Sequence, residues 1–270
     1  MNEVTVKNCI FGNGIPKICV PLIGGSREEI LANALVIKKE AESLENEYRD
    51  KAVKVDVIEF RADYYNEVTD RHKLENLMAE LREIFSDRLI LFTYRSEDEG
   101  GELRHDRAES MIEDIWEWVI AGKMSDIIDI ELKSGNYRVA RAAVKAHEAG
   151  MAVIMSNHNF EKTPHNEEIL EMFREMEILG ADILKMASFP RSHFDVDRMV
   201  ELTKDISSGK VGAEYIRHPV IIISMGKEGV VTRTKCKENG CAMTFSSVGS
   251  GSAPGQVSLR EMFEIVSADK

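Results

Sequence analysis

The feature that most constrains the fold of this chain is a repeat of short apolar runs, each followed by an amphipathic stretch. The runs are rich in Ile, Val, Leu and Phe and do not alternate with polar residues, a pattern typical of parallel strands covered on both faces. The runs occupy residues 17–23, 55–61, 88–94, 126–132, 151–156, 182–187, 219–225 and 242–247. Because parallel strands need crossover connections, the stretches between these runs predict helices.

The clearest helical pattern follows the fifth run. Between Ile169 and Leu179, apolar residues recur at spacings of three and four, which places them on one face of a helix. Thr163 and Pro164 predict the N-cap and the first helical residue, and Gly180 predicts the end of the helix.

Eight strand–helix repeats within about 250 residues fit a closed (β/α)8 TIM barrel better than an open sheet. We therefore predict an α/β barrel forming one domain over residues 1–270. The segments 4–7 and 9–11 precede the first repeat, and we predict a short N-terminal hairpin that closes the bottom of the barrel.

Composition excludes several classes of protein. The net charge of −12 disfavours a nucleic-acid binder and a binder of anionic membranes. No apolar stretch is long enough for a transmembrane helix, and the N-terminus lacks the pattern of a signal peptide, so we expect a cytoplasmic protein. Cys236 and Cys241 have no matching second pair, so we expect neither structural zinc nor disulfides but free thiols, including Cys9 and Cys19.

In a barrel of this kind the active site lies at the carboxyl ends of the strands. Three arginines, one lysine and one histidine fall there: Arg61, Arg95, Arg233, Lys185 and His158. Such a cluster in an acidic protein indicates an anionic small-molecule substrate, because guanidinium groups bind carboxylates in bidentate fashion. The alternative for each arginine is a salt bridge at the barrel end, which is plausible for Arg61 beside Glu59.

Lys185 is the residue that most specifically indicates catalysis. It stands inside a short apolar strand, where desolvation favours the neutral amine that can attack a carbonyl to form an imine. The alternative is a strand-end lysine that reaches water or pairs with a carboxylate. His158, after the fifth strand, is a candidate proton shuttle, or else a loop histidine. Glu99 could orient His158, although it also fits a solvated acidic loop.

Taken together, these motifs resemble the type I 3-dehydroquinate dehydratase family of the shikimate pathway. The motifs follow one another in the family's order and span nearly the whole chain. They are Glu59-Phe-Arg61, Phe92-Thr-Tyr-Arg95-Ser, Glu99-Gly-Gly-Glu102, Asp129-Ile-Glu131-Leu, Val153-Ile-Met-Ser-Asn157-His158-Asn159, Gly180-Ala-Asp-Ile-Leu-Lys185, Ser224-Met-Gly-Lys-Glu-Gly and Ser252-Ala-Pro-Gly-Gln256.

The resemblance implies a mechanism. Lys185 would form a Schiff base with the C3 ketone of 3-dehydroquinate. His158 would remove a C2 proton and then protonate the departing C1 hydroxyl in a syn elimination, with Glu99 holding and polarising His158. The resemblance also implies a family that uses no metal and no organic cofactor and is often a homodimer.

The resemblance further implies the residues that bind the substrate. Arg233 and Gln256 would bind its carboxylate, and Ser252 would belong to a loop that closes over it. Its ring hydroxyls would contact Glu59, Arg61 and Arg95. Three positions depart from the family pattern: Pro21 replaces a common serine, which removes a hydroxyl, Ile223 replaces a methionine found in some members, and Gly251 replaces a common alanine.

Two rival functions remain open. One is a class I aldolase, which shares a buried strand lysine but cleaves a carbon–carbon bond. The other is a non-catalytic barrel that binds a small carboxylate as a sensor.

Overall fold

The computed structural model of the chain describes residues 2–102, 110–249 and 253–268. Its central feature is a curled sheet of parallel strands in the order β11-β10-β3-β4-β5-β6-β7-β8-β9. The barrel strands are β3 (Lys17–Leu22), β4 (Val55–Arg61), β5 (Leu89–Thr93), β6 (Ile127–Glu131), β7 (Ala152–Asn159), β8 (Ile183–Ser188), β9 (Val220–Ser224) and β10 (Met243–Ser247). Each corresponds to one of the predicted apolar runs.

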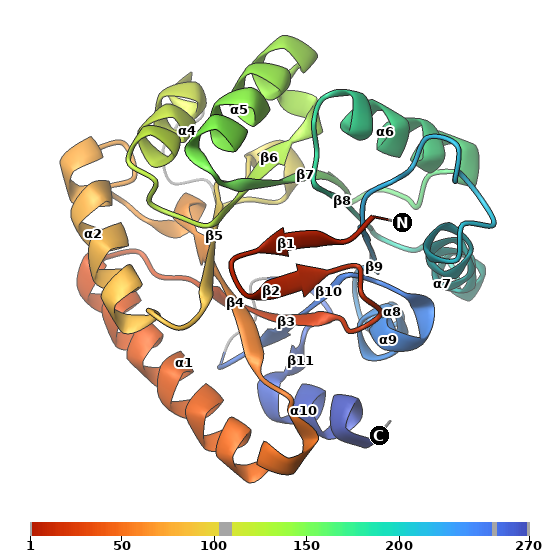
Figure 1. Cartoon of the computed structure of the whole chain (residues 1–270), viewed down its shortest axis with the longest axis horizontal. Helices are drawn as coiled ribbons and strands as arrows, with labels where there is room; N and C mark the ends of the chain where they lie inside the picture. The colour runs from red at the N-terminus through yellow and green to blue at the C-terminus, as the bar shows by residue number, and fades with distance from the viewer. Residues whose placement is uncertain (1, 103–109, 250–252, 269–270) are drawn as a thin grey trace.

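The sheet curls into a barrel surrounded by helices, as Figure 1 shows. At the seam between β9 and β10, the Ala242 N–H donates a 2.9 Å hydrogen bond to the Val220 carbonyl. The short strand β11 (Val257–Ser258) pairs with β10 on the edge opposite to β3. The helices are α1 (Arg27–Glu47), α2 (Arg71–Ile84), α4 (Ile112–Ala121), α5 (Asn136–Ala149), α6 (Asn166–Ile178), α7 (His193–Ser207), α8 (Val230–Thr234), α9 (Cys236–Asn239) and α10 (Leu259–Ala268). Short 3-10 turns are η1 (Arg49–Lys51), η2 (Ala62–Tyr64), η3 (Glu97–Glu99) and η4 (Leu132–Ser134). The predicted TIM-barrel class is confirmed.

Successive strand residues belong to two separate apolar layers. Ile154 on β7 packs inside the barrel, whereas its neighbours Val153 and Met155 pack outward against the helices. This alternation explains why the runs are continuously apolar: both faces of every strand are buried. It also decides which polar residues at the strand ends face the barrel interior.

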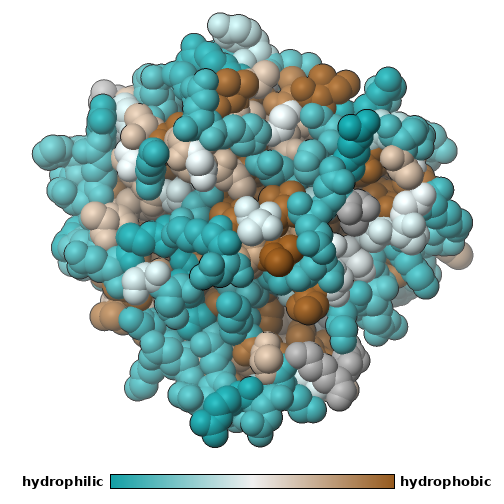
Figure 2. Space-filling model, viewed as in Figure 1, coloured by the Kyte–Doolittle hydropathy of each residue, from teal (hydrophilic) through white to brown (hydrophobic). Residues whose placement is uncertain are grey.

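The predicted N-terminal hairpin is confirmed and consists of β1 (Val4–Val6) and β2 (Cys9–Phe11). It lies across the centre of the barrel in Figure 1, and Phe11 is fully buried against the interior layer near the start of the strands. The hairpin therefore closes the bottom of the barrel and leaves the carboxyl ends of the strands for the site. The same face in Figure 2 is covered mostly by hydrophilic residues.

Two details differ from the sequence-based predictions. Helix α6 begins at Asn166 with His165 as its N-cap, not at Thr163, because the Thr163 hydroxyl is buried and accepts a 3.0 Å hydrogen bond from Ser188. Strand β7 continues to Asn159, so His158 belongs to the strand and pairs with Ala187 of β8. The pairing continues because β8 also runs on to Ser188.

Among the described residues, no helix is both long and apolar enough to cross a bilayer.

Candidate active site

A pocket opens at the carboxyl ends of the barrel strands. Strand alternation turns Lys185 into the barrel, whereas Leu184 and Met186 pack outward. The residues that line the pocket are Glu59, Arg61, His158, Lys185, Ala187, Ile223, Met225, Arg233, Phe245, Ala253 and Gln256. The pocket therefore brings together six of the nine site residues expected from the sequence. Glu99 lies in contact with one of them, and Ser252 lies outside the described residues.

Lys185 is buried, and its Nζ atom has polar and aromatic neighbours. Nζ lies 2.9 Å from Asp129 Oδ2 and 3.8 Å from Glu59 Oε1. It also lies 4.9 Å from the centre of the Phe245 ring, a cation–π distance. The apolar strand predicted a desolvated amine. In the structure the nitrogen is shielded from bulk water and also has a carboxylate partner.

His158 is oriented by Glu99. The Nδ1 atom of His158 lies 2.9 Å from Glu99 Oε2, and the His158 backbone N–H donates to the same oxygen at 3.0 Å. The Asn157 side-chain amide donates to the other Glu99 oxygen at 3.3 Å. Because Glu99 occupies Nδ1, the Nε2 atom is the one available to a ligand in the pocket.

Burial and neighbouring charges shift the titration of this pair. Burial lowers the pKa of His158 well below 6.5, and the positive charges of Arg95 and Lys185 lower it further. Burial, followed by the charge of Glu131, raises the pKa of Glu99 to about 8. The shift of His158 favours a neutral imidazole, which is the form that a general base needs.

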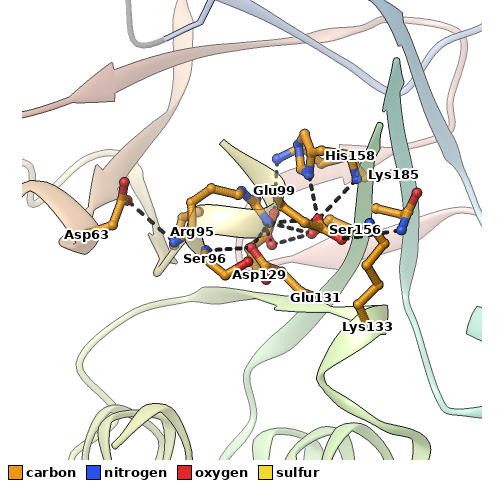
Figure 3. Close-up of polar contacts among 12 residues, drawn as sticks. Asp63, Arg95, Ser96, Glu99, Asp129, Glu131, Lys133, Ser156, His158 and Lys185 are labelled. Atoms are coloured by element: carbon orange, nitrogen blue, oxygen red, sulfur yellow. Dashed lines mark hydrogen bonds and ion pairs between the residues drawn. The ribbon is translucent and has the colours of Figure 1, made fainter. Parts of the chain in front are cut away.

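Arg95 lies beneath the pocket and does not line it. Its guanidinium contacts Glu131 at 2.7 Å, Asp129 at 2.9 Å and Glu99 at 3.6 Å. It also donates to Ser156 Oγ at 3.0 Å. Figure 3 shows this network, in which Arg95 links the carboxylate beside Lys185 to the carboxylate beside His158.

The two arginines that line the pocket differ in their partners. Arg61 forms a bidentate ion pair with Asp63, at 2.8 and 2.7 Å. Arg233, on α8, is 3% exposed, and among the described residues the one hydrogen bond of its side chain runs from the guanidinium to the Pro254 carbonyl at 3.4 Å. Its Nε is buried without a hydrogen-bond partner there, and burial lowers its pKa to about 10. Arg233 is therefore a buried cation suited to an incoming anion.

Several residues that build the site have no role predicted from the sequence. Asp129 and Ser156 support Lys185 and Arg95 from β6 and β7, and Phe245 packs on Lys185 from β10. The sequence pattern could have indicated Asp129, since an acidic residue inside the apolar run 126–132 needs a buried partner. It could not have indicated Phe245, because an aromatic residue in a strand usually belongs to the hydrophobic core.

The four cysteines are free and buried. In the part of the chain that the structure describes, no group of three or more His, Cys, Asp or Glu side chains is arranged to hold a metal ion.

The sequence of this chain is similar to those of known proteins. Residues 18–270 match the sequence model of type I 3-dehydroquinase. A 3-dehydroquinate dehydratase of Klebsiella pneumoniae is 39% identical over 270 residues, covering 98% of this chain and 99% of the relative. The corresponding protein of Listeria welshimeri is 37% identical over 266 residues, covering 98% and 97%.

A solved structure gives the same result. The type I 3-dehydroquinate dehydratase of Clostridium difficile, crystallised with covalently modified comenic acid, superposes with a TM-score of 0.86 at 34% identity, covering 99% of this chain and 97% of that one. The match in sequence and fold extends over almost the entire length of both chains. The chain belongs to the type I 3-dehydroquinase family.

Proposed function

We propose that the chain dehydrates 3-dehydroquinate to 3-dehydroshikimate by a syn elimination through a Schiff base on Lys185. The observation that carries the proposal is the convergence of Lys185, His158 and Arg233 on one pocket. A ketone with a carboxylate needs such a set: a nucleophile, a proton shuttle and a buried cation.

The proposed reaction starts with attack of Lys185 Nζ on the C3 ketone, which gives an iminium and one water. The iminium withdraws electrons from C2, and neutral His158 takes a C2 proton through Nε2. The resulting enamine expels the C1 hydroxyl, which leaves as water with the proton from His158. Hydrolysis of the conjugated imine then frees the product and the lysine. A positioned general base contributes about 10²–10⁴-fold to such a step.

The pocket also supports the assignment of binding residues. We assign the substrate carboxylate to Arg233 and Gln256, because Arg233 is the buried cation without a carboxylate partner among the described residues. Glu59 and Arg61 face the same pocket and suit ring hydroxyls.

Arg95 is engaged by carboxylates outside the pocket, so we assign it the role of positioning Asp129 and Glu99. Ser252 as part of a closing loop remains a prediction.

The place of the protein in the cell follows from the same proposal. A dehydratase of this specificity serves the shikimate pathway, and we propose a cytoplasmic homodimer that acts on a small anionic substrate without a cofactor.

Steady-state kinetics with 3-dehydroquinate test the proposed function directly. We expect the ultraviolet absorbance of the conjugated enone product to rise at a rate proportional to enzyme. Carbon–carbon cleavage without enone formation would favour the aldolase. Tight binding of 3-dehydroquinate without turnover would favour the sensor.

A further inference from the structure

The carboxylate of Asp129 is held on one side and faces Lys185 on the other. Its Oδ1 atom accepts hydrogen bonds from Ser156 Oγ at 2.6 Å and lies 2.9 Å from an Arg95 guanidinium nitrogen. Its Oδ2 atom lies 2.9 Å from Lys185 Nζ. Asp129 is fully buried. Figure 3 shows that three separate segments converge on this one carboxylate.

The chemistry of imine formation explains what such a carboxylate can do. An ammonium and a ketone give an iminium and one water, so the nitrogen is positively charged before and after the reaction. Two of the three ammonium protons end on the oxygen that leaves as water: one is released before attack and the other passes from the nitrogen of the carbinolamine. No net proton is gained or lost, and the iminium retains one N–H that can donate to a fixed acceptor.

We propose that Asp129 is a catalytic residue, which holds Lys185 Nζ in place and acts as its counterion from the ammonium to the iminium. This inference rests on the proposed function, because it assumes a Schiff base on Lys185. Its consequence is that the imine nitrogen stays protonated, which is the state in which it withdraws electrons from C2.

Other charged groups around Lys185 and Asp129 are less suited to this role. Glu59 is 3.8 Å from Nζ and accepts a 3.0 Å hydrogen bond from the Thr93 hydroxyl. Burial alone would raise the pKa of Asp129, but Arg95 and Lys185 lower it to about 2, so the carboxylate is charged throughout the working pH range. Titratable groups that surround this pair include Cys19 from β3, Glu59 and Arg61 from β4, Arg95 after β5, Glu99 from η3, His158 from β7 and Arg233 from α8.

The test compares Asp129→Asn with Glu131→Gln. Both residues are buried and both bind Arg95, but Asp129 alone of the two contacts Lys185. We measure kcat between about pH 6 and 9, and the yield of borohydride-trapped adduct on Lys185 in each protein. For Asp129→Asn we expect a kcat at least about 100-fold lower, and a new decline of kcat with rising pH. Glu131→Gln is expected to show no such new decline at high pH, although the loss of its charge also changes the titration of Glu99.

The outcomes separate the two proposals. If wild-type protein forms no trapped adduct, the Schiff base itself is wrong. If wild-type protein traps the adduct and Asp129→Asn keeps the wild-type kcat and pH profile, the role of Asp129 is wrong. An equal change of profile in Glu131→Gln would also overturn it, since a loosened Arg95 would then account for both. Should Asp129→Asn fail to fold, Ser156→Ala replaces it: a partial decline of kcat at high pH supports the proposal, and a wild-type profile contradicts it.

Discussion

Replacement of Arg233 by methionine separates stability from binding, because the two are expected to change in opposite directions. Burial lowers the pKa of Arg233 from its ordinary value to about 10. A shift of this size corresponds to about 3 kcal/mol by which the folded state disfavours the charged form. Methionine keeps most of the apolar volume and removes the charge. We therefore expect the free energy of unfolding of ligand-free Arg233→Met to rise by up to about 3 kcal/mol.

The substrate complex of the same variant is expected to weaken. Loss of one partner of a buried charged pair costs about 2–5 kcal/mol, which is at least about a 30-fold loss of affinity. Lys235 provides a matched control, because it follows the same helix but is half exposed. Lys235→Met should change neither quantity appreciably.

Urea unfolding and steady-state kinetics on the three proteins measure both effects. An unchanged KM in Arg233→Met, together with a loss of stability above about 1 kcal/mol, would refute the assignment. Arg233 would then be a structural cation whose partner lies outside the pocket.

Further expectations concern the lysine, the histidine and a distant ion pair. Lys185→Ala should retain the wild-type circular dichroism spectrum but lose turnover; a wild-type rate would exclude the imine. His158→Ala should still give a borohydride-trapped adduct but turn over about 10²–10⁴-fold more slowly, and absence of any adduct would give His158 another role. Since burial lowers the pKa of His158 in the folded protein, kcat/KM should stay high below pH 6.5; an acid limb at pH 6.5 in the rate profile would contradict this. The same pKa shift means that the unfolded chain binds more protons than the folded chain below pH 6.5, so stability should fall as pH falls. His158→Gln should reduce this loss of stability, as urea unfolding at several pH values can measure. Arg88→Ala should lose about 1.5–3 kcal/mol of stability with kcat unchanged, because it removes the two hydrogen bonds from the buried guanidinium to Glu45, at 2.7 and 3.0 Å.

The architecture was predictable because a barrel strand is buried on both faces. The predicted run 55–61 has the same first and last residues as β4. The other predicted strands differ from the observed ones mainly at their ends. Strand ends are less certain because the last residues depend on tertiary partners. His158 lies within β7 since β8 continues beside it, which no local pattern in 151–159 reveals.

The site was predictable in its residue types but not in its pairings. The sequence placed Arg61, Arg95 and Arg233 on one rim, where all three could bind an anion. Their partners distinguish them: Arg61 is held by Asp63, two residues on, and Arg95 by carboxylates from other strands. The partners of Arg95 depend on the stagger of neighbouring strands and on inward or outward orientation. A run that is apolar on both faces specifies neither.

The measurement that tests the central claim most directly is the intact mass of the protein after reaction with 3-dehydroquinate and borohydride, followed by peptide mapping. We predict one reduced adduct per chain, on the peptide that contains Lys185, and none in Lys185→Ala. A folded wild-type protein that turns over substrate without any adduct, or with the adduct on another lysine, would contradict the assignment of Lys185 as nucleophile.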